Sequence, residues 1–159
     1  MRRVVSLVVL AMATVLAQRQ PTSDFLVNNL LAAHNAVRSR VGVKPLVWSE
    51  ELADFAQQWA DNLAARGQLF HRRHPPYGEN LYEMTGGGAS PEQVVNDWAS
   101  ESKDYQYKSN TCRRVCGHYT QIVWRDTKRV GCAVARSGRT EIWVCNYDPP
   151  GNRIGKRPY

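Results

Sequence analysis

Apolar residues recur at the spacing of an amphipathic helix in three stretches of the chain. The first stretch begins near Ser23 and ends at Gly42. Its apolar face carries Val27, Leu30, Leu31, His34 and Val37. The second begins after Ser49, which suits an N-cap, and ends at Gly67, which suits a helix C-terminus. The third begins at residues 90–93, Ser-Pro-Glu-Gln, which combine an N-cap serine, a first-turn proline and a capping-box glutamine.

A different pattern marks the C-terminal part of the chain. Residues 129–136 and 140–147 are rich in Val, Ile, Trp and Cys, and a Ser-Gly pair lies between them, which predicts a β-hairpin. Residues 68–90 hold prolines and three successive glycines and are expected to be mostly loop, and the tail 149–159 is expected to be irregular. Helices followed by a hairpin indicate an α+β domain in which helices pack on an antiparallel sheet.

Residues 1–17 have the layout of a secretory signal peptide. Two arginines precede an almost wholly apolar stretch, residues 4–16, and small residues follow at a suitable cleavage point. The apolar stretch is shorter than a membrane-spanning helix requires, although an uncleaved anchor is the alternative. We therefore expect residues 18–159 to form one secreted, extracellular domain with its own hydrophobic core.

The formal net charge of the chain is +7 at pH 7, and the basic residues are scattered. The densest groups are Arg72–Arg73, Arg113–Arg114 and the tail residues Arg153, Lys156 and Arg157. A nucleic-acid-binding protein would concentrate its charge on one helix or stripe, so no nucleic-acid partner is expected. A secreted basic protein is instead expected to meet anionic walls or membranes, and a monomer is expected.

The four cysteines are Cys112, Cys116, Cys132 and Cys145. In a secreted chain an even number of cysteines predicts disulfides, here two. The most local of three connectivities pairs Cys112 with Cys116 and Cys132 with Cys145. A zinc site is the alternative, but only the first two cysteines have ligand-like spacing, and thiolates oxidise outside the cell.

Two glutamates and two histidines are the candidates for chemistry. Glu101 follows Trp98 by three residues, so on a helix its carboxylate shares the apolar face, where an unpaired charge is costly. A cation, a hydrogen-bond donor or a metal must therefore offset it. Glu79 precedes an Asn-Leu pair, with His71 shortly before it, and His118 follows the second cysteine closely.

These residues lie within motifs that resemble, in order, the signature motifs of the CAP superfamily of extracellular proteins, and the C-terminal residues resemble its plant pathogenesis-related class-one branch. The similarity covers essentially all of residues 18–159. The matching segments are Ala33–Arg38, His71, Tyr77–Asn80, Trp98–Glu101, Cys116–Trp124, Arg129–Ala133 and Cys145–Gly151.

The resemblance implies an α-β-α sandwich with a central antiparallel sheet and an open cleft. The cleft is expected to hold a tetrad, carried over by motif, of His71, Glu79, Glu101 and His118. His74 is an alternative to the first of these, because the loop before the Gly-Glu-Asn motif varies in length. Plant members usually have one further pair of cysteines, but this chain has Gly67 and Ser137 there, so a whole disulfide is missing at a cost in stability.

Two histidines and two carboxylates suit a cation such as zinc, and the resemblance implies that some members bind it. A metal-dependent hydrolase is one alternative, although the His-Glu-x-x-His helix of many zinc hydrolases is absent and no serine or cysteine nucleophile is recognisable. The other alternative is a buried hydrogen-bonded network that links loops. We expect no enzymatic activity, and no cofactor other than zinc.

The resemblance also implies binding of sterols or fatty acids. Tyr105 and Tyr107 are candidate lipid contacts, although ordinary anchoring of their loop is the alternative. A third function implied is release of residues 149–159 as a defence-signalling peptide, for which an irregular tail is a suitable cleavage region. We therefore expect a secreted plant defence protein of the apoplast, acting against fungi or oomycetes through the sterols or membrane lipids of the pathogen.

Overall fold

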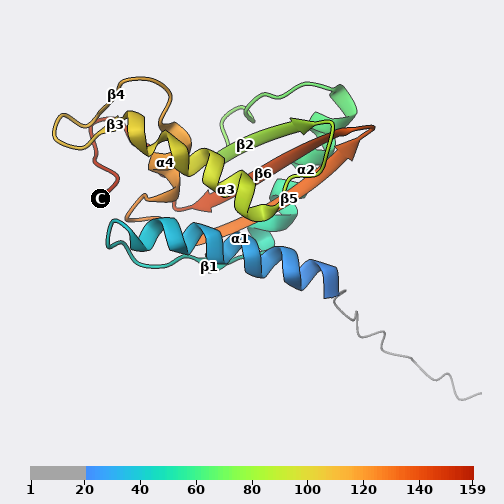
Figure 1. Ribbon diagram of the computed structural model, residues 1–159, viewed down its shortest axis with the longest axis horizontal. Helices are drawn as coiled ribbons and strands as arrows, with labels where there is room; N and C mark the ends of the chain where they lie inside the picture. The colour runs from blue at the N-terminus through green and yellow to red at the C-terminus, as the bar shows by residue number, and fades with distance from the viewer. Residues whose placement is uncertain (1–20) are drawn as a thin grey trace, which may run out of the picture.

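The computed structural model describes residues 21–159, which form a four-stranded sheet between two layers of helices (Figure 1). One face of the sheet packs on α2 (Glu50–Arg66). The other face packs on α1 (Pro21–Ser39), α3 (Pro91–Ser100) and α4 (Gly117–Ile122). The predicted α+β class and the α-β-α sandwich are therefore confirmed. The predicted signal peptide lies outside the described residues.

The sheet has the order β1–β5–β6–β2. The predicted hairpin is confirmed as β5 (Arg129–Ser137) and β6 (Thr140–Asp148), and β2 (Gly78–Thr85) pairs antiparallel with β6. The two-residue strand β1 (Val47–Trp48) pairs parallel with β5, so the sheet is mixed rather than wholly antiparallel.

The strand β2 corrects the expectation that residues 68–90 are mostly loop. Its first residues are polar, and this concealed it in the sequence. Asn80 is nevertheless 1% exposed, because its amide donates to the hydroxyl of Tyr147 and to the carbonyl of His118, both at 3.1 Å. Burial of a polar side chain requires such partners, and these come from distant parts of the chain.

The helix boundaries follow the predicted caps. Ser49 accepts a hydrogen bond from Leu52 N, and Gly67 adopts a left-handed φ of 61° at the end of α2. Ser90 and Gln93 form a complete capping box at the start of α3. Short elements follow α3: the 3₁₀ helix η1 (Glu101–Asp104), then β3 (Tyr105–Gln106) and β4 (Thr111–Cys112), which pair as a small second sheet.

Disulfides join Cys112 to Cys116 and Cys132 to Cys145, and the second crosses directly between β5 and β6. One close contact fixes α2 against the sheet. A Cβ added at Gly131 would lie 2.2 Å from Ala53 N and 2.5 Å from Ser49 O, so only glycine lets β5 approach the start of α2 this closely. Gly67 and Ser137, the positions of the missing pair of cysteines, are both exposed.

No helix within residues 21–159 is both long enough and apolar enough to cross a membrane. The tail 149–159 is irregular, as expected, yet it packs along the molecule. Pro158 is buried, and its carbonyl accepts a hydrogen bond from Arg125 N.

Candidate functional site

The C-terminal end of α3 and the start of α4 bring Glu101 and His118 together. His118 Nδ1 donates to Glu101 Oε1 at 2.7 Å, and the backbone N–H groups of His118 and Tyr119 donate to Oε2 at 3.0 and 3.2 Å. Burial acts to raise the pKa of Glu101, but the hydrogen bonds from His118 and the backbone outweigh it and hold the pKa below the usual 4.5. The expectation that a donor must offset this carboxylate is met.

A second pair forms between the loop after α2 and the start of β2. His71 Nδ1 lies 2.8 Å from Glu79 Oε1, and Arg72 N donates to the same oxygen at 3.1 Å. The Glu79 side chain is only 3% exposed, whereas that of His71 is 61% exposed. The hydrogen bond that His71 donates to the Glu79 carboxylate raises the pKa of His71. His74, the alternative to His71, is exposed and has a positive φ of 49°.

Asn80 links the segments that carry the two pairs. It follows Glu79 in β2, and its amide donates to the carbonyl of His118. Asn80 was missed as a site residue in the sequence, although it stands within the Gly-Glu-Asn motif. Arg72 was also missed: its guanidinium lies 3.8 Å from the centre of the Phe55 ring and donates to the Phe55 carbonyl at 2.9 Å, which fixes the loop next to His71.

The same arrangement recurs at both histidines. Nδ1 is engaged by a carboxylate, and no hydrogen bond from the described residues reaches Nε2 of either ring. Carboxylates in this position orient metal-binding histidines in many proteins. The second oxygen of Glu79, Oε2, is buried without a hydrogen-bond partner. Each histidine therefore offers one Nε2 atom, free of hydrogen bonds from the described residues, as a potential ligand for a cation.

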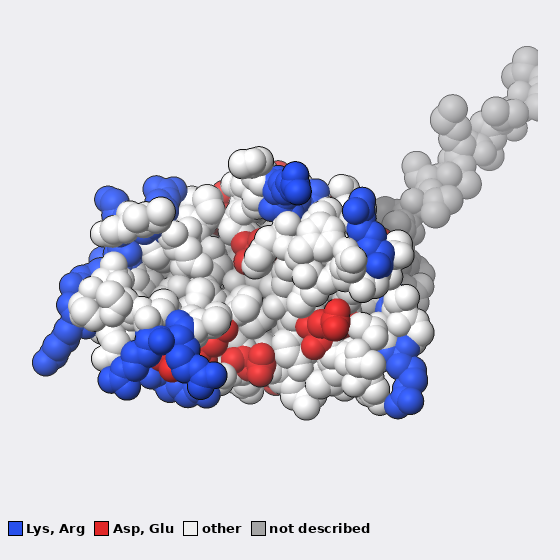
Figure 2. Space-filling view, turned by 90° about the horizontal axis from the view of Figure 1, so that it is seen from above, with Lys and Arg blue, Asp and Glu red and all other residues white. Residues whose placement is uncertain are grey.

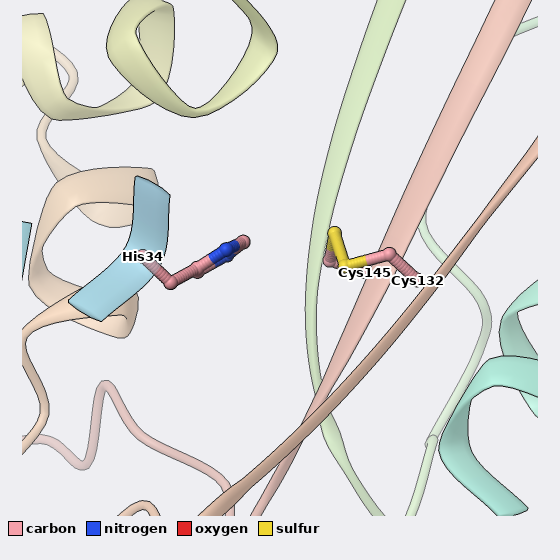
Figure 3. A group of neighbouring side chains, drawn as sticks. All are labelled: His34, Cys132 and Cys145. Atoms are coloured by element: carbon pink, nitrogen blue, oxygen red, sulfur yellow. A yellow bond between two sulfur atoms is a disulfide. The ribbon is translucent and has the colours of Figure 1, made fainter. Parts of the chain in front are cut away.

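A third group of potential ligand atoms lies in the core, where His34 on α1 points toward the Cys132–Cys145 disulfide (Figure 3). His34 Nδ1 donates to the Leu30 carbonyl at 2.7 Å, and Nε2 accepts from the Tyr147 hydroxyl at 2.9 Å. Both ring nitrogens are engaged in hydrogen bonds and both sulfurs form the disulfide, so none of these atoms is available to a metal. The three side chains are therefore packed core residues. Burial lowers the pKa of His34 to about 4. This agrees with the position of His34 on the apolar face of the first predicted helix, which indicates a core residue.

The two candidate lipid contacts differ in exposure. Tyr105 is buried and its ring contacts those of Tyr119 and Tyr159, whereas Tyr107 is 49% exposed. Both residues lie at the start of the segment 105–117, and the tail 149–159 packs against this segment. Only Tyr107 is therefore accessible to a ligand from solvent.

Several hollows lie on the part of the chain that the structure describes. One, of about 1070 Å³, is lined by residues of the loop after α1, by Tyr107, by residues 125–128 and by the tail, and includes none of the four tetrad residues. A smaller one, of about 590 Å³, lies beside Trp59 and Arg72. Figure 2 shows acidic side chains toward the middle of one face and basic side chains around its ends.

A model of the cysteine-rich secretory protein family, CAP, matches residues 31–147. The chain belongs to the CAP family. Pathogenesis-related protein 1 of Arabidopsis thaliana is 50% identical over 129 residues, which are 80% of this chain and 78% of that protein. Pathogenesis-related protein 1A of Nicotiana tabacum is 48% identical over 132 residues, covering 81% of this chain and 78% of that protein.

Solved CAP structures share the fold. Venom allergen-like protein 4 of Schistosoma mansoni superposes with a TM-score of 0.68 at 28% identity, covering 83% of this chain and 92% of that one. NaASP2, solved with Zn²⁺, superposes with a TM-score of 0.72 at 25% identity, covering 84% of each chain. The relatives named as pathogenesis-related proteins support a role in defence for this member of the family.

Proposed function

We propose that this CAP protein is secreted and acts against fungal or oomycete pathogens by binding sterols or other lipids of their membranes. The defence role is supported by 50% identity to a plant pathogenesis-related protein 1 over 80% of the chain. Secretion agrees with the two disulfides, which persist in oxidising compartments.

The observation that carries the lipid part of the proposal is the exposure of Tyr107. Its ring is 49% exposed and stacks on that of Tyr159 at 5.1 Å between centroids. An amphipathic aromatic ring held in place by a second ring offers a sterol a rigid apolar surface together with a polar hydroxyl. The neighbouring hollow of about 1070 Å³ provides space beside it.

A titration of the purified protein with a fluorescent sterol tests this proposal. We expect saturable binding that Tyr107→Ala weakens by about tenfold, because the lost ring contact contributes about 1–2 kcal/mol. Phe25→Ala is the matched control, since Phe25 is also an exposed aromatic residue, 66% exposed, but belongs to the first part of α1. The start of α1 lies at the opposite end of the molecule from β3 and β4 (Figure 1). Binding that does not saturate, or that both variants weaken equally, contradicts the proposal.

We also propose that the two histidine–glutamate pairs bind zinc. The supporting observation is that both Nδ1 atoms are engaged by carboxylates while both Nε2 atoms lack a hydrogen bond from the described residues. His71 and His118 would hold the ion, and Glu79 and Glu101 would orient the rings. A bound zinc ion supplies Lewis acidity, which is the chemistry that a hydrolase would need.

A further inference from the structure

The positive charge of this protein is concentrated on two short segments. Residues 105–117 and 149–159 contain six of the 21 lysines and arginines and none of the 14 aspartates and glutamates. The six are Lys108, Arg113, Arg114, Arg153, Lys156 and Arg157. The rest of the chain is nearly neutral, with 15 basic against 14 acidic side chains. The net charge of +7 therefore comes mostly from this one pair of segments, which contributes +6, while the rest of the chain contributes +1.

The fold brings these two segments side by side at one end of the molecule, where β3, β4 and the C-terminus lie in Figure 1. Arg157 donates to the carbonyls of Tyr107 and Lys108, the latter at 3.0 Å. Asn110 donates to the Lys156 carbonyl at 3.1 Å. We call the surface of residues 105–117 and 149–159 the hairpin–tail surface.

The hairpin–tail surface is also unusually apolar. Tyr107, Val115 and Ile154 are 49%, 67% and 104% exposed, and they make up three of the six exposed large hydrophobic residues among those described. All three lie on the same two adjoining segments, and exposed apolar side chains that gather on one surface indicate an interaction site. None of the six cations forms an ion pair with another described residue, so their charges are available to a partner.

The adjoining hollow extends this positive surface. Lys44, Arg125 and Lys128 line it together with Arg153, against a single acidic side chain, Asp126. The hollow shares Tyr107 with the hairpin–tail surface. Cations and apolar side chains thus continue from the hairpin–tail surface into the lining of this hollow.

We propose that the hairpin–tail surface docks on bilayers that contain anionic phospholipids. The lysines and arginines contact the headgroup phosphates, and Ile154 and Val115 enter the boundary between headgroups and acyl chains. The inference rests on the proposed lipid function and names the kind of membrane that the protein meets. The proposal adds a preference for anionic membranes, which binding of a neutral sterol alone does not provide.

The apolar residues favour a bilayer over an acidic polysaccharide, the other polyanion that a secreted basic protein meets. A sugar chain, which is polar throughout, gains little from an exposed isoleucine. A bilayer uses both the apolar side chains and the cations.

Co-sedimentation of the full protein with vesicles tests the proposal. We expect binding to vesicles of phosphatidylcholine with phosphatidylserine, weak binding to phosphatidylcholine alone, and a loss of binding as salt is added. Lys108→Gln combined with Arg114→Gln lowers the partition coefficient about twenty-five-fold, because each cation near an anionic surface contributes about fivefold. Arg66→Gln with Arg139→Gln removes the same charge elsewhere on the surface and leaves binding nearly unchanged.

A second variant tests the apolar contribution. Ile154→Ser keeps the charge and, because the residue is fully exposed, should leave folding intact. We expect it to lower vesicle binding about fivefold or more. Equal binding to both kinds of vesicle contradicts the proposal, as does equal loss in the two charge variants. A third outcome is that the protein does not bind vesicles but binds polygalacturonate in a salt-sensitive way, and that Ile154→Ser leaves this binding unchanged. This outcome assigns the surface to a polysaccharide instead.

The sterol titration in neutral detergent separates this inference from the proposed function. If sterol binds but anionic vesicles do not, the docking proposal is wrong and the sterol proposal stands. If anionic vesicles bind and sterol does not, the reverse holds.

Discussion

Glu101 and His118 are joined by two hydrogen bonds at once, one to the imidazole Nδ1 at 2.7 Å and one to the backbone N–H at 3.0 Å. The carboxylate thereby fixes the ring orientation and caps the start of α4. The short helix has no side-chain cap of its own from Cys116, the residue in the N-cap position. Glu101 therefore supports both the candidate site and the local fold.

Replacing Glu101 with Gln is expected to lower the free energy of unfolding by about 1–2 kcal/mol, because the donors lose a charged acceptor. Urea denaturation measures the change. Glu83→Gln, at an exposed position in β2, is the matched control and should change stability by less than about 0.5 kcal/mol. A loss no larger than that of the control contradicts this role of Glu101.

The same pair predicts a pH dependence in acid. The pKa of Glu101 in the folded state lies below its usual 4.5, so its contribution to stability is present above pH 4.5 and is lost as the pH falls through the lowered pKa. Glu101→Gln should lack this component, so its stability should fall less steeply in that range than that of the wild type. Parallel stability profiles for the two proteins would show that the carboxylate is not stabilised by folding.

His34 predicts a second pH effect at higher pH. Its pKa is lowered from 6.5 to about 4 because the ring is fully buried. The unfolded chain therefore binds a proton that the folded protein excludes, and stability falls by about 3 kcal/mol as the pH drops from 6.5 to 4. NMR titration should find the midpoint of His34 near 4, and a midpoint near 6.5 would contradict the buried, neutral ring.

Zinc binding distinguishes His71 from the neighbouring His74 as the ligand. We expect His71→Gln and His118→Gln each to weaken zinc binding, measured by calorimetry, by about tenfold or more, since each removes one ring ligand. His74→Gln is the matched control in the same loop and should bind zinc as the wild type does. Equal effects of His71→Gln and His74→Gln would overturn the assignment of His71.

The tail is predicted to remain attached unless its anchors are broken. The Tyr159 hydroxyl lies 3.1 Å from that of Tyr119, and Thr120 donates to Asn152 at 2.7 Å. Tyr159→Ala should therefore raise amide hydrogen exchange across residues 149–159, and a peptide cut at Pro149 should dissociate faster from this variant. Ile154→Ala, at an exposed tail position without such a bond, should leave both rates nearly unchanged.

Local signals predicted much of the fold. Ser49, Gly67 and Ser90 marked helix ends correctly because capping depends on neighbouring residues. The strand β2 was missed because Asn80 is buried by partners at His118 and Tyr147, which no local pattern reveals. The parallel pairing of β1 is likewise a tertiary contact.

The candidate site was likewise predicted from the sequence only in part. Motifs named the four tetrad residues, and the structure places each histidine beside one glutamate. The sequence did not separate Tyr105 from Tyr107, because the difference comes from tertiary contacts: the Tyr105 ring meets both Tyr119 and Tyr159, whereas Tyr107 stacks on Tyr159 alone. Nor did it reveal the hairpin–tail surface, since that surface joins segments more than thirty residues apart.

Inhibition of pathogen growth with and without added sterol tests the central claim most directly. If the protein acts by sequestering sterol, saturating it with free sterol beforehand should abolish inhibition, and Tyr107→Ala should inhibit far less than Phe25→Ala or the wild type. Inhibition that persists unchanged in the sterol-saturated protein and in Tyr107→Ala would contradict the account.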